Sequence, residues 1–210
     1  KYKRCRAAVD SGVNLVVELP LFYAVSSAEI FAAGAVATLN ALNASFISFG
    51  CENADIQMLK KIAITLVNEP DEYKKHLKKA LTCGDSFPTA RAKALSEFFK
   101  SDDISRLISS PNNILAIEYI KEIIKSESAV TPVALTRKIS GYHDNEIHEN
   151  IASASAIRKI LHDSGIHKNN DSRCKNIKEL QNVMPEAMYN ILASESQNNA
   201  LIYADDFSSM

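Results

Sequence analysis

Residues 13–50 decide the fold: the sequence is VNLVVELP at 13–20, SSAEI at 26–30 and ASFISFG at 44–50. The first and third stretches are short, apolar and rich in β-branched or aromatic residues, which is typical of buried strands. The middle stretch fits a capping box, with Ser26 as N-cap and Glu29 three residues later, and it predicts a helix. This order predicts a β-α-β unit with parallel strands and a right-handed crossover.

Helical spacing of apolar residues continues from about 55 to 125, which is too long for one crossover helix. We therefore expect a helical insertion over about 55–125 within an α/β domain that covers residues 1–165. Strand character returns at 129–136, and a further helix begins near 153. Residues 166–210 are expected to be the start of a truncated helical C-terminal region, so the chain has the features of a fragment.

The chain has 210 residues, of which 46% are apolar, and a formal net charge of −1, which excludes a largely disordered protein. The longest uncharged stretch, 30–51, contains asparagines and many alanines, so no membrane span is expected. The four cysteines form no C-x-x-C pair, which favours free thiols in a reducing, cytoplasmic setting. The balanced charge argues against a protein that coats nucleic acid non-specifically.

Ser153, Ser155 and Arg158 form a candidate phosphate site at the start of a predicted helix. Exposed backbone N–H groups, the helix dipole and a guanidinium group together favour a polyphosphate. The alternative is a serine N-cap followed by an ordinary surface arginine.

Further candidates lie near the ends of the predicted strands. Gly50 ends a strand, where α/β proteins bind ligands, although a lone glycine is more often a turn. Asn112 lies in the first turn of a helix capped by Ser110, and its amide suits either a ligand or turn chemistry. Arg137 and Lys138 follow a strand and suit phosphate or carboxylate, or form a solvated pair.

A basic helix face is predicted at Lys74, Lys75, Lys78 and Lys79. Residues 70–100 contain seven Lys and Arg against four Asp and Glu, although the whole chain is slightly acidic. The pattern favours contact with a phosphate backbone, and the alternative is a solvated helix face. His143 and His148 flank carboxylates, but their spacing matches no helical H-x-x-x-H arrangement and such histidines are usually solvated, so no metal site is expected.

Seven ordered motifs resemble those of the bacterial tRNA(Met) cytidine acetate ligases. They are NLVVELP at 14–20, YAV at 23–25, IFA at 30–32, FGCEN at 49–53, SPNNIL at 110–115, Arg137 followed by YHD at 142–144, and IASASAIR at 151–158. The resemblance covers residues 1–161 and continues more weakly to DDF at 205–207.

This resemblance implies a Rossmann-like nucleotidyltransferase fold and an adenylating enzyme. Such enzymes use ATP, with Mg2+, to convert acetate to acetyl-adenylate, and then acetylate N4 of the wobble cytidine of elongator tRNA(Met). The positions that resemble ATP-contacting residues are Gly50, Asn112, Arg137, Lys138, Ser153, Ser155 and Arg158. Lys138 departs from the apolar residue common in the family, so any contact there is expected through its backbone.

The family begins with a strand and a loop of the type EYNPFHxGH, and no such loop is present in these 210 residues. The resemblance therefore implies that catalytic histidines lie outside this chain and that the chain alone is inactive. A non-catalytic nucleotide- or RNA-binding module is the alternative to the enzyme.

Overall fold

A computed structural model describes residues 2–136, 147–148, 151–152, 154–163 and 180–197. The chain divides into two compact units, one formed by residues 18–137 and the other by residues 1–17 with 138–210. The predicted domain of residues 1–165, with a separate region from 166, stays a prediction.

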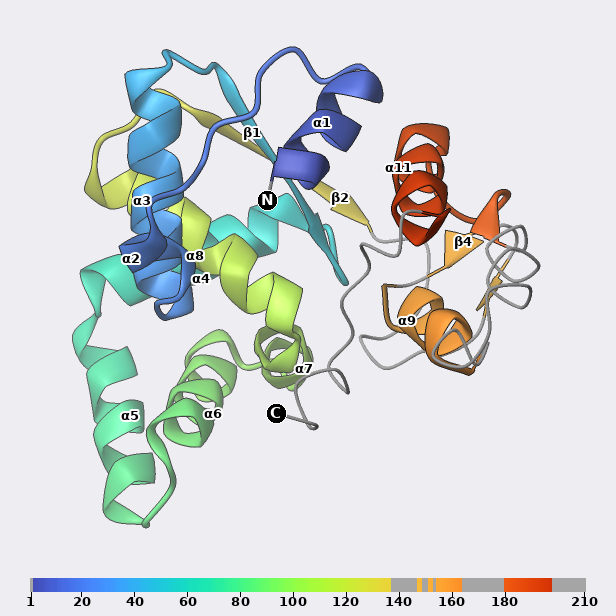
Figure 1. Ribbon diagram of the computed structural model, residues 1–210. Coiled ribbons are helices and arrows are strands. Elements are labelled where there is room, and N and C mark those ends of the chain that lie inside the picture. The colour runs from blue at the N-terminus through green and yellow to red at the C-terminus, as the bar shows by residue number, and fades with distance from the viewer. Residues whose placement is uncertain (1, 137–146, 149–150, 153, 164–179, 198–210) are drawn as a thin grey trace. The chain divides into compact units, whose positions relative to one another are not determined.

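The larger unit contains seven helices and two strands among its described residues (Figure 1). In chain order they are α2 (Leu21–Ala24), α3 (Ala28–Ala41), β1 (Phe46–Cys51), α4 (Ile56–Asn68), α5 (Asp71–Thr82), α6 (Phe87–Phe99), α7 (Asp103–Ser109), α8 (Pro111–Lys125) and β2 (Thr131–Thr136). The predicted α/β fold class is confirmed.

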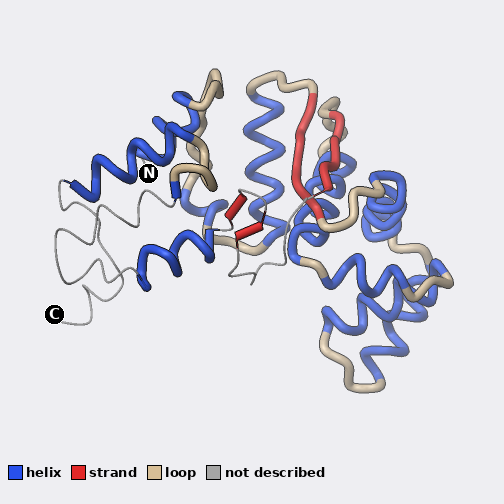
Figure 2. The backbone as a smooth tube through the Cα atoms, turned by 90° about the vertical axis from the view of Figure 1, so that its right-hand side faces the viewer, coloured by secondary structure: helices blue, strands red, loops and turns tan. Residues whose placement is uncertain are grey.

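Strands β1 and β2 are parallel neighbours, although the five helices α4 to α8 separate them in the sequence (Figure 2). Their register pairs Phe46 with Thr131 and Gly50 with Leu135. Both strands therefore end at the same edge, which is where ligands bind in parallel α/β sheets. The strands predicted at 44–50 and 129–136 are confirmed.

One face of this sheet forms the core of the larger unit. Side chains alternate along β1, with Ile47, Phe49 and Cys51 buried and the residues between them exposed. Helices α4 and α8 pack against the strands, and α3 packs against α8. The alternation explains why β1 is a strand: Ile47, Phe49 and Cys51 all face the core on one side.

The strand predicted at 13–20 is wrong. Residues 13–20 form no regular secondary structure, and the side chain of Leu15 is 61% exposed. Among the described residues, β1 pairs only with β2, and no strand pairs with this stretch. Because β-branched residues favour a strand mainly through packing and pairing, their pattern alone does not create one.

The predicted capping box at Ser26 is also wrong by one residue. Helix α3 begins at Ala28, with Ser27 in the N-cap position, and the Ser26 hydroxyl donates to the carbonyl of Phe22. The Glu29 carboxylate accepts a hydrogen bond from Lys125 instead of the backbone. The attraction of a lysine on a neighbouring helix therefore replaces the local cap.

Helix α3 also shows why small residues lie on its face. A Cβ atom on Gly34 would lie 2.3 Å from Cγ of Tyr23, so only glycine admits the tyrosine ring at this point. The small residues on this helix had suggested close packing on a sheet, but α3 packs mainly against α8 and α2.

The helical character predicted over 55–125 is confirmed by α4 to α8. These helices differ in role, because α4 and α8 pack on the strands, whereas α5 and α6 pack mainly on each other. Only the hairpin of α5 and α6 is thus an insertion in the strict sense, and Figure 1 shows it extending away from β1 and β2.

The smaller unit contains α1 (Tyr2–Asp10), β3 (Ile147–His148), β4 (Ile151–Ala152), α9 (Ala154–Asp163) and α11 (Glu186–Gln197). Strands β3 and β4 form a short antiparallel pair, and α9 follows β4 closely in the chain. Helix α1 packs against α11. The helix predicted to open near residue 153 is confirmed.

Candidate functional site

The carboxyl end of β1 is tied to the N-terminus of α8 by Asn113. This side chain is 1% exposed, and its Oδ1 accepts hydrogen bonds from the backbone N–H groups of Glu52 at 3.0 Å and Asn53 at 3.3 Å. Its Nδ2 donates to the carbonyl oxygen of Leu107 at 2.9 Å. One buried carboxamide therefore holds the turn after β1 against the C-terminal end of α7.

The Glu52 side chain in turn accepts hydrogen bonds from the start of α8. Its Oε2 accepts from the backbone N–H of Asn113 at 3.2 Å, and its Oε1 accepts from Nδ2 of Asn112 at 2.7 Å. Ser110, the N-cap residue of α8, makes no side-chain capping bond, and its hydroxyl donates to the Arg106 carbonyl. Glu52 thus supplies the negative charge and the acceptor that the start of a helix requires.

The same turn leads into α4 through two local caps. The backbone N–H of Asp55 donates to Oδ1 of Asn53 at 3.0 Å. Oδ1 of Asp55 accepts from the backbone N–H groups of Gln57 and Met58 at 3.1 and 3.0 Å. The backbone from Glu52 to Met58 is therefore held by hydrogen bonds on both sides of the turn.

Of the predicted site residues, the structure places Gly50 and Asn112 at this edge. Gly50 is exposed in β1, opposite Leu135 of β2, and lies two residues before Glu52, which contacts Asn112. Asn112 is half-buried. Cys51, between Gly50 and Glu52, is fully buried, and this burial raises the pKa of its thiol.

The other predicted ATP residues belong to the second unit or lie outside the described residues. Arg137, Lys138 and Ser153 are not among the residues that the structure describes. Ser155 lies in the first turn of α9, and Arg158 is exposed one turn later on the same helix. Their roles as ATP contacts stay predictions.

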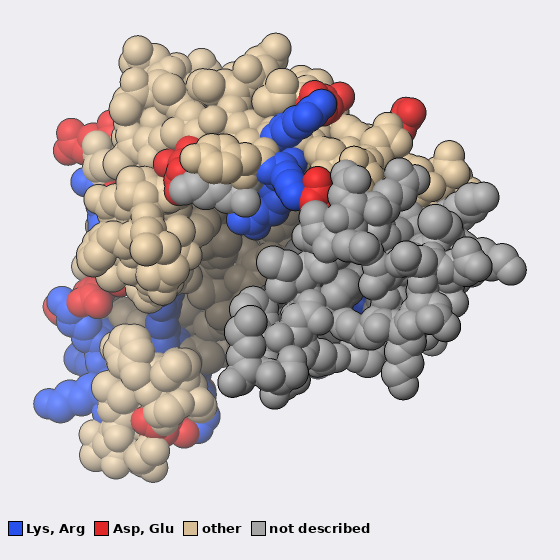
Figure 3. Space-filling view, viewed as in Figure 1, with Lys and Arg blue, Asp and Glu red and all other residues tan. Residues whose placement is uncertain are grey.

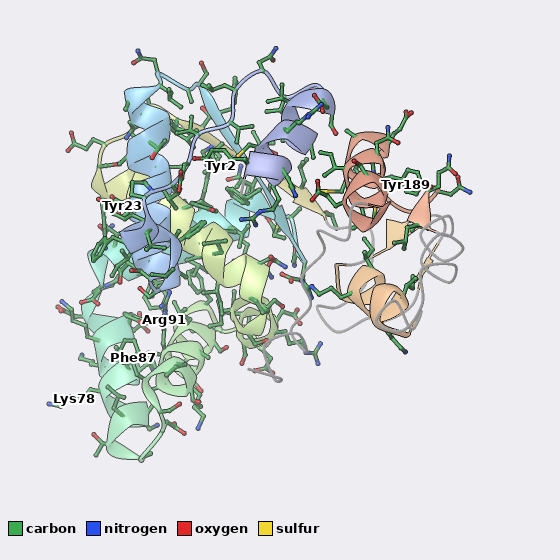
Figure 4. The ribbon with its side chains drawn as sticks, viewed as in Figure 1. Tyr2, Tyr23, Lys78, Phe87, Arg91 and Tyr189 are labelled. Atoms are coloured by element: carbon green, nitrogen blue, oxygen red, sulfur yellow. The ribbon has the colours of Figure 1, made fainter. Side chains whose placement is uncertain are left out.

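The four predicted RNA-binding lysines lie on α5. Within the part of the chain that the structure describes, Lys74, Lys75, Lys78 and Lys79 form no ion pair. Basic side chains gather at the outer edge of this hairpin in Figure 3, and Lys78 points away from it in Figure 4.

The two basic residues of α6 behave differently from these lysines. Arg91 forms an ion pair with the buried Glu118 at 3.2 Å, and Lys93 pairs with Asp85 at 2.8 Å. Glu118 also accepts from Lys121 at 2.6 Å. The pair of Arg91 with Glu118 connects α6 to α8. Arg91 and Lys93 of α6 are thus both neutralised. Among the described residues, the lysines of this hairpin that have no ion-pair partner are those of α5.

Sequence reasoning missed Glu52 and the structural role of Asn113. They belong to the motifs FGCEN and SPNNIL, and the two asparagines were candidates for a ligand, but nothing local distinguishes the buried asparagine from its half-buried neighbour. The available signal was the pair of asparagines in the first turn of a helix, where asparagine is a poor helix former.

Three other features provide no site. A groove between α1 and α11 is lined by Lys3 and Arg6, but these cations pair with Glu195 and Asp10. Among the described residues, no three His, Cys, Asp or Glu side chains cluster closely enough to hold a metal ion, and His143 lies outside these residues. None of the described helices is long and apolar enough to cross a membrane.

Comparison with known proteins shows that the sequence is similar to one group of enzymes. The chain is 41% identical over 207 residues to the tRNA(Met) cytidine acetate ligase of Clostridium novyi, covering 98% of this chain and 49% of the relative. It is 43% identical over 205 residues to the enzyme of the same name from Clostridium perfringens strain SM101, covering 93% of this chain and 48% of the relative. The chain thus spans about half the length of these relatives, and the resemblance seen in its motifs is confirmed.

Solved structures show the same fold. The crystal structure of Thermotoga maritima TmcAL bound with alpha-thio ATP is 31% identical, with a TM-score of 0.79 over 94% of this chain and 44% of that chain. The apo form of the same protein matches with a TM-score of 0.81 over 94% of this chain and 45% of that chain. The predicted Rossmann-like nucleotidyltransferase fold is confirmed. A sequence model of the HIGH Nucleotidyl Transferase family matches residues 1–210, and the chain therefore belongs to this family.

Proposed function

We propose that the protein containing this chain activates acetate with ATP and acetylates N4 of the wobble cytidine of elongator tRNA(Met). The observation that carries the proposal is the edge of β1, where Glu52, Asn112 and Asn113 build a rigid polar turn at the end of a parallel strand. Such an edge is where α/β proteins bind nucleotides. The choice of reaction rests on the relatives of this chain, which are named tRNA(Met) cytidine acetate ligase.

ATP binding would use two groups of residues. Gly50 leaves space beside the strand end, and Asn112 offers its carboxamide to the base or ribose. Arg137, Ser153, Ser155 and Arg158 would hold the phosphates, the arginines by charge-assisted hydrogen bonds and the serines with the start of α9, and Lys138 would contribute through its backbone. The thio-ATP complex of the Thermotoga maritima protein supports ATP as the ligand.

Activation places an acetate oxygen on the α-phosphorus of ATP, forms the mixed anhydride acetyl-adenylate and releases pyrophosphate. The N4 amino group of cytidine then attacks the acetyl carbon, and AMP leaves. Mg2+ would enter with ATP, because this ion usually keeps its waters and binds substrate phosphates with few protein ligands. In this chain the proposed task of the residues is to bind and orient ATP, which brings the reacting groups together.

The proposed tRNA contact is the lysine face of α5, formed by Lys74, Lys75, Lys78 and Lys79. Four cations on one helix, with no ion-pair partner among the described residues, suit the phosphate backbone of an RNA, because each contact releases a bound counterion. The neutralised pairs of Arg91 and Lys93 on α6 leave this role to α5.

Acetate-dependent exchange of radioactive pyrophosphate into ATP tests the first half of the reaction on the complete gene product. Exchange that requires acetate is expected, followed by N4-acetylcytidine in elongator tRNA(Met) when tRNA is added. ATP binding without exchange would instead favour a nucleotide-binding module without catalytic activity.

A further inference from the structure

We infer that Glu52 is a positioning residue that makes the nucleotide site select adenine. It fixes the carboxamide of Asn112 so that the remaining donor and acceptor of that side chain match the edge of a 6-aminopurine. The inference rests on the proposed function, in which Asn112 contacts ATP, and extends it to the choice of base.

The contact between Glu52 and Asn112 fixes the orientation of the Asn112 carboxamide. Oε1 of Glu52 lies 2.7 Å from the Asn112 amide, and a carboxylate only accepts hydrogen bonds. The Asn112 atom at this contact must therefore be the NH2 group. If the carboxamide were reversed, its oxygen would face the carboxylate, and two acceptors would meet.

Glu52 is itself held in place, so this orientation is built into the fold. Its second oxygen accepts from the backbone N–H of Asn113, and its own backbone N–H donates to the Asn113 side chain. Asn113 is buried and tied to Leu107. The carboxylate thus has no freedom to follow a rotating Asn112.

A count of hydrogen-bonding groups shows what is left for a ligand. A carboxamide has two N–H donors and one oxygen acceptor. Glu52 uses one donor, and among the described residues no donor reaches Oδ1 of Asn112. One N–H and the oxygen of the Asn112 carboxamide are therefore left for a ligand.

This pair is complementary to adenine. On the Watson–Crick edge, the 6-amino group of adenine donates to the carboxamide oxygen and N1 accepts from the N–H. This is the same donor and acceptor pattern as in the usual pairing of asparagine with N6 and N7 of adenine. Hypoxanthine carries an oxygen in place of the amino group and a protonated N1, which would require the reversed carboxamide. Glu52 opposes that reversal, and so it opposes ITP.

The test is the ratio of kcat/KM for ATP to that for ITP in acetate-dependent exchange, measured for the complete protein and for Glu52→Gln. A glutamine offers Asn112 either its oxygen or its NH2 group, so both carboxamide orientations become acceptable. The ratio is expected to fall about 10-fold or more, the size of one bidentate base contact. Asp55→Asn is the matched control, because it makes the same change three residues away in a cap of α4, and its ratio should equal the wild-type value.

Deoxynucleotides separate the base from the ribose, whose hydroxyls are also donors. If Glu52→Gln changes the preference for ATP over 2′-deoxy-ATP or 3′-deoxy-ATP but leaves the ATP to ITP ratio unaltered, adenine selection is overturned. An unaltered ATP to ITP ratio in Asn112→Ala would also overturn adenine selection. This variant keeps the contact between Glu52 and Asn113, so the result holds even if Glu52→Gln does not fold. Equilibrium binding of ATP and of ITP measures the same preference without catalysis. If the complete protein binds ATP but shows no exchange, the result contradicts the proposed function and leaves the test of adenine selection intact.

Discussion

Glu52 and Asn113, 61 residues apart in the chain, hold each other through two reciprocal hydrogen bonds. The backbone N–H of each residue donates to the side chain of the other, at 3.0 Å from Glu52 and at 3.2 Å from Asn113. The arrangement works like a capping box, but its two members come from a strand end and a helix start instead of one helix. It joins the end of β1 to α8 and thereby sets the geometry of the candidate nucleotide site.

Asn113→Ala should lower the free energy of unfolding by about 2–4 kcal/mol, because it leaves two backbone N–H groups and the Leu107 carbonyl without their partner at a buried position. Urea denaturation measures this loss. Asn112→Ala is the control, since that side chain is half-buried and makes one bond among the described residues, and it should cost less than about 1 kcal/mol. Equal losses in both variants would contradict the clamp assigned to Asn113.

Arg158→Ala should weaken the use of ATP, since a guanidinium paired with phosphate contributes about 1.5–3 kcal/mol. Acetate-dependent pyrophosphate exchange at varied ATP measures the change in the complete protein. The exposed neighbour Lys159 provides the control, and Lys159→Ala should retain wild-type exchange. Unchanged exchange in folded Arg158→Ala would remove Arg158 from the phosphate site.

Lys74→Glu combined with Lys78→Glu should weaken tRNA binding and reduce the slope of log affinity against log salt by roughly 0.7–0.9 for each tRNA phosphate that is no longer neutralised. Exchange of pyrophosphate should be retained, because α5 packs on α6 and not on the strands. A filter-binding series from low to high salt gives the slope. Lys61→Glu with Lys100→Glu changes the net charge equally at exposed positions elsewhere, and should leave the slope closer to the wild-type value.

If the double variant at Lys74 and Lys78 binds tRNA with the wild-type slope, the lysines of α5 form only a solvated face. Loss of exchange together with tRNA binding would instead indicate misfolding.

Glu29 should add a small pH-dependent contribution to stability. The hydrogen bond from Lys125, with the charge of Lys121, holds the pKa of this carboxyl below its ordinary value of 4.5. The unfolded state therefore binds more protons in this range, so the contribution is complete above the ordinary pKa and is lost as the pH falls through the lowered one. Because the side chain is 58% exposed, solvent screening limits the contribution to less than about 1 kcal/mol.

Urea denaturation of Glu29→Gln checks this contribution. The variant should be less stable than the wild type above the ordinary pKa of 4.5, and the difference should shrink as the pH falls through the lowered pKa of Glu29. Glu127→Gln removes the same charge from an exposed residue without an ion pair among the described residues, and no such convergence is expected. A constant difference between Glu29→Gln and the wild type at all pH values would contradict the role of the lysines.

Local pattern was sufficient for much of the fold. The short apolar run at 44–50, the proline and serine at the start of α8, and the helical spacing from 55 to 125 predicted elements that the structure contains. Each of these signals acts within a few residues, through strand propensity, capping or helical periodicity. The ordered motifs also pointed to the family before any three-dimensional contact was known.

Tertiary structure decided the rest. The residues at 13–20 have the composition of a strand but none of its pairing, and Glu29 has the spacing of a cap but contacts lysines of another helix. The sequence placed Asn112 and Gly50 near strand and helix ends, whereas the roles of Glu52 and Asn113 depend on a contact across 61 residues. Such a contact forms only when packing of α8 against β1 brings the two turns together, and no local pattern encodes that distance.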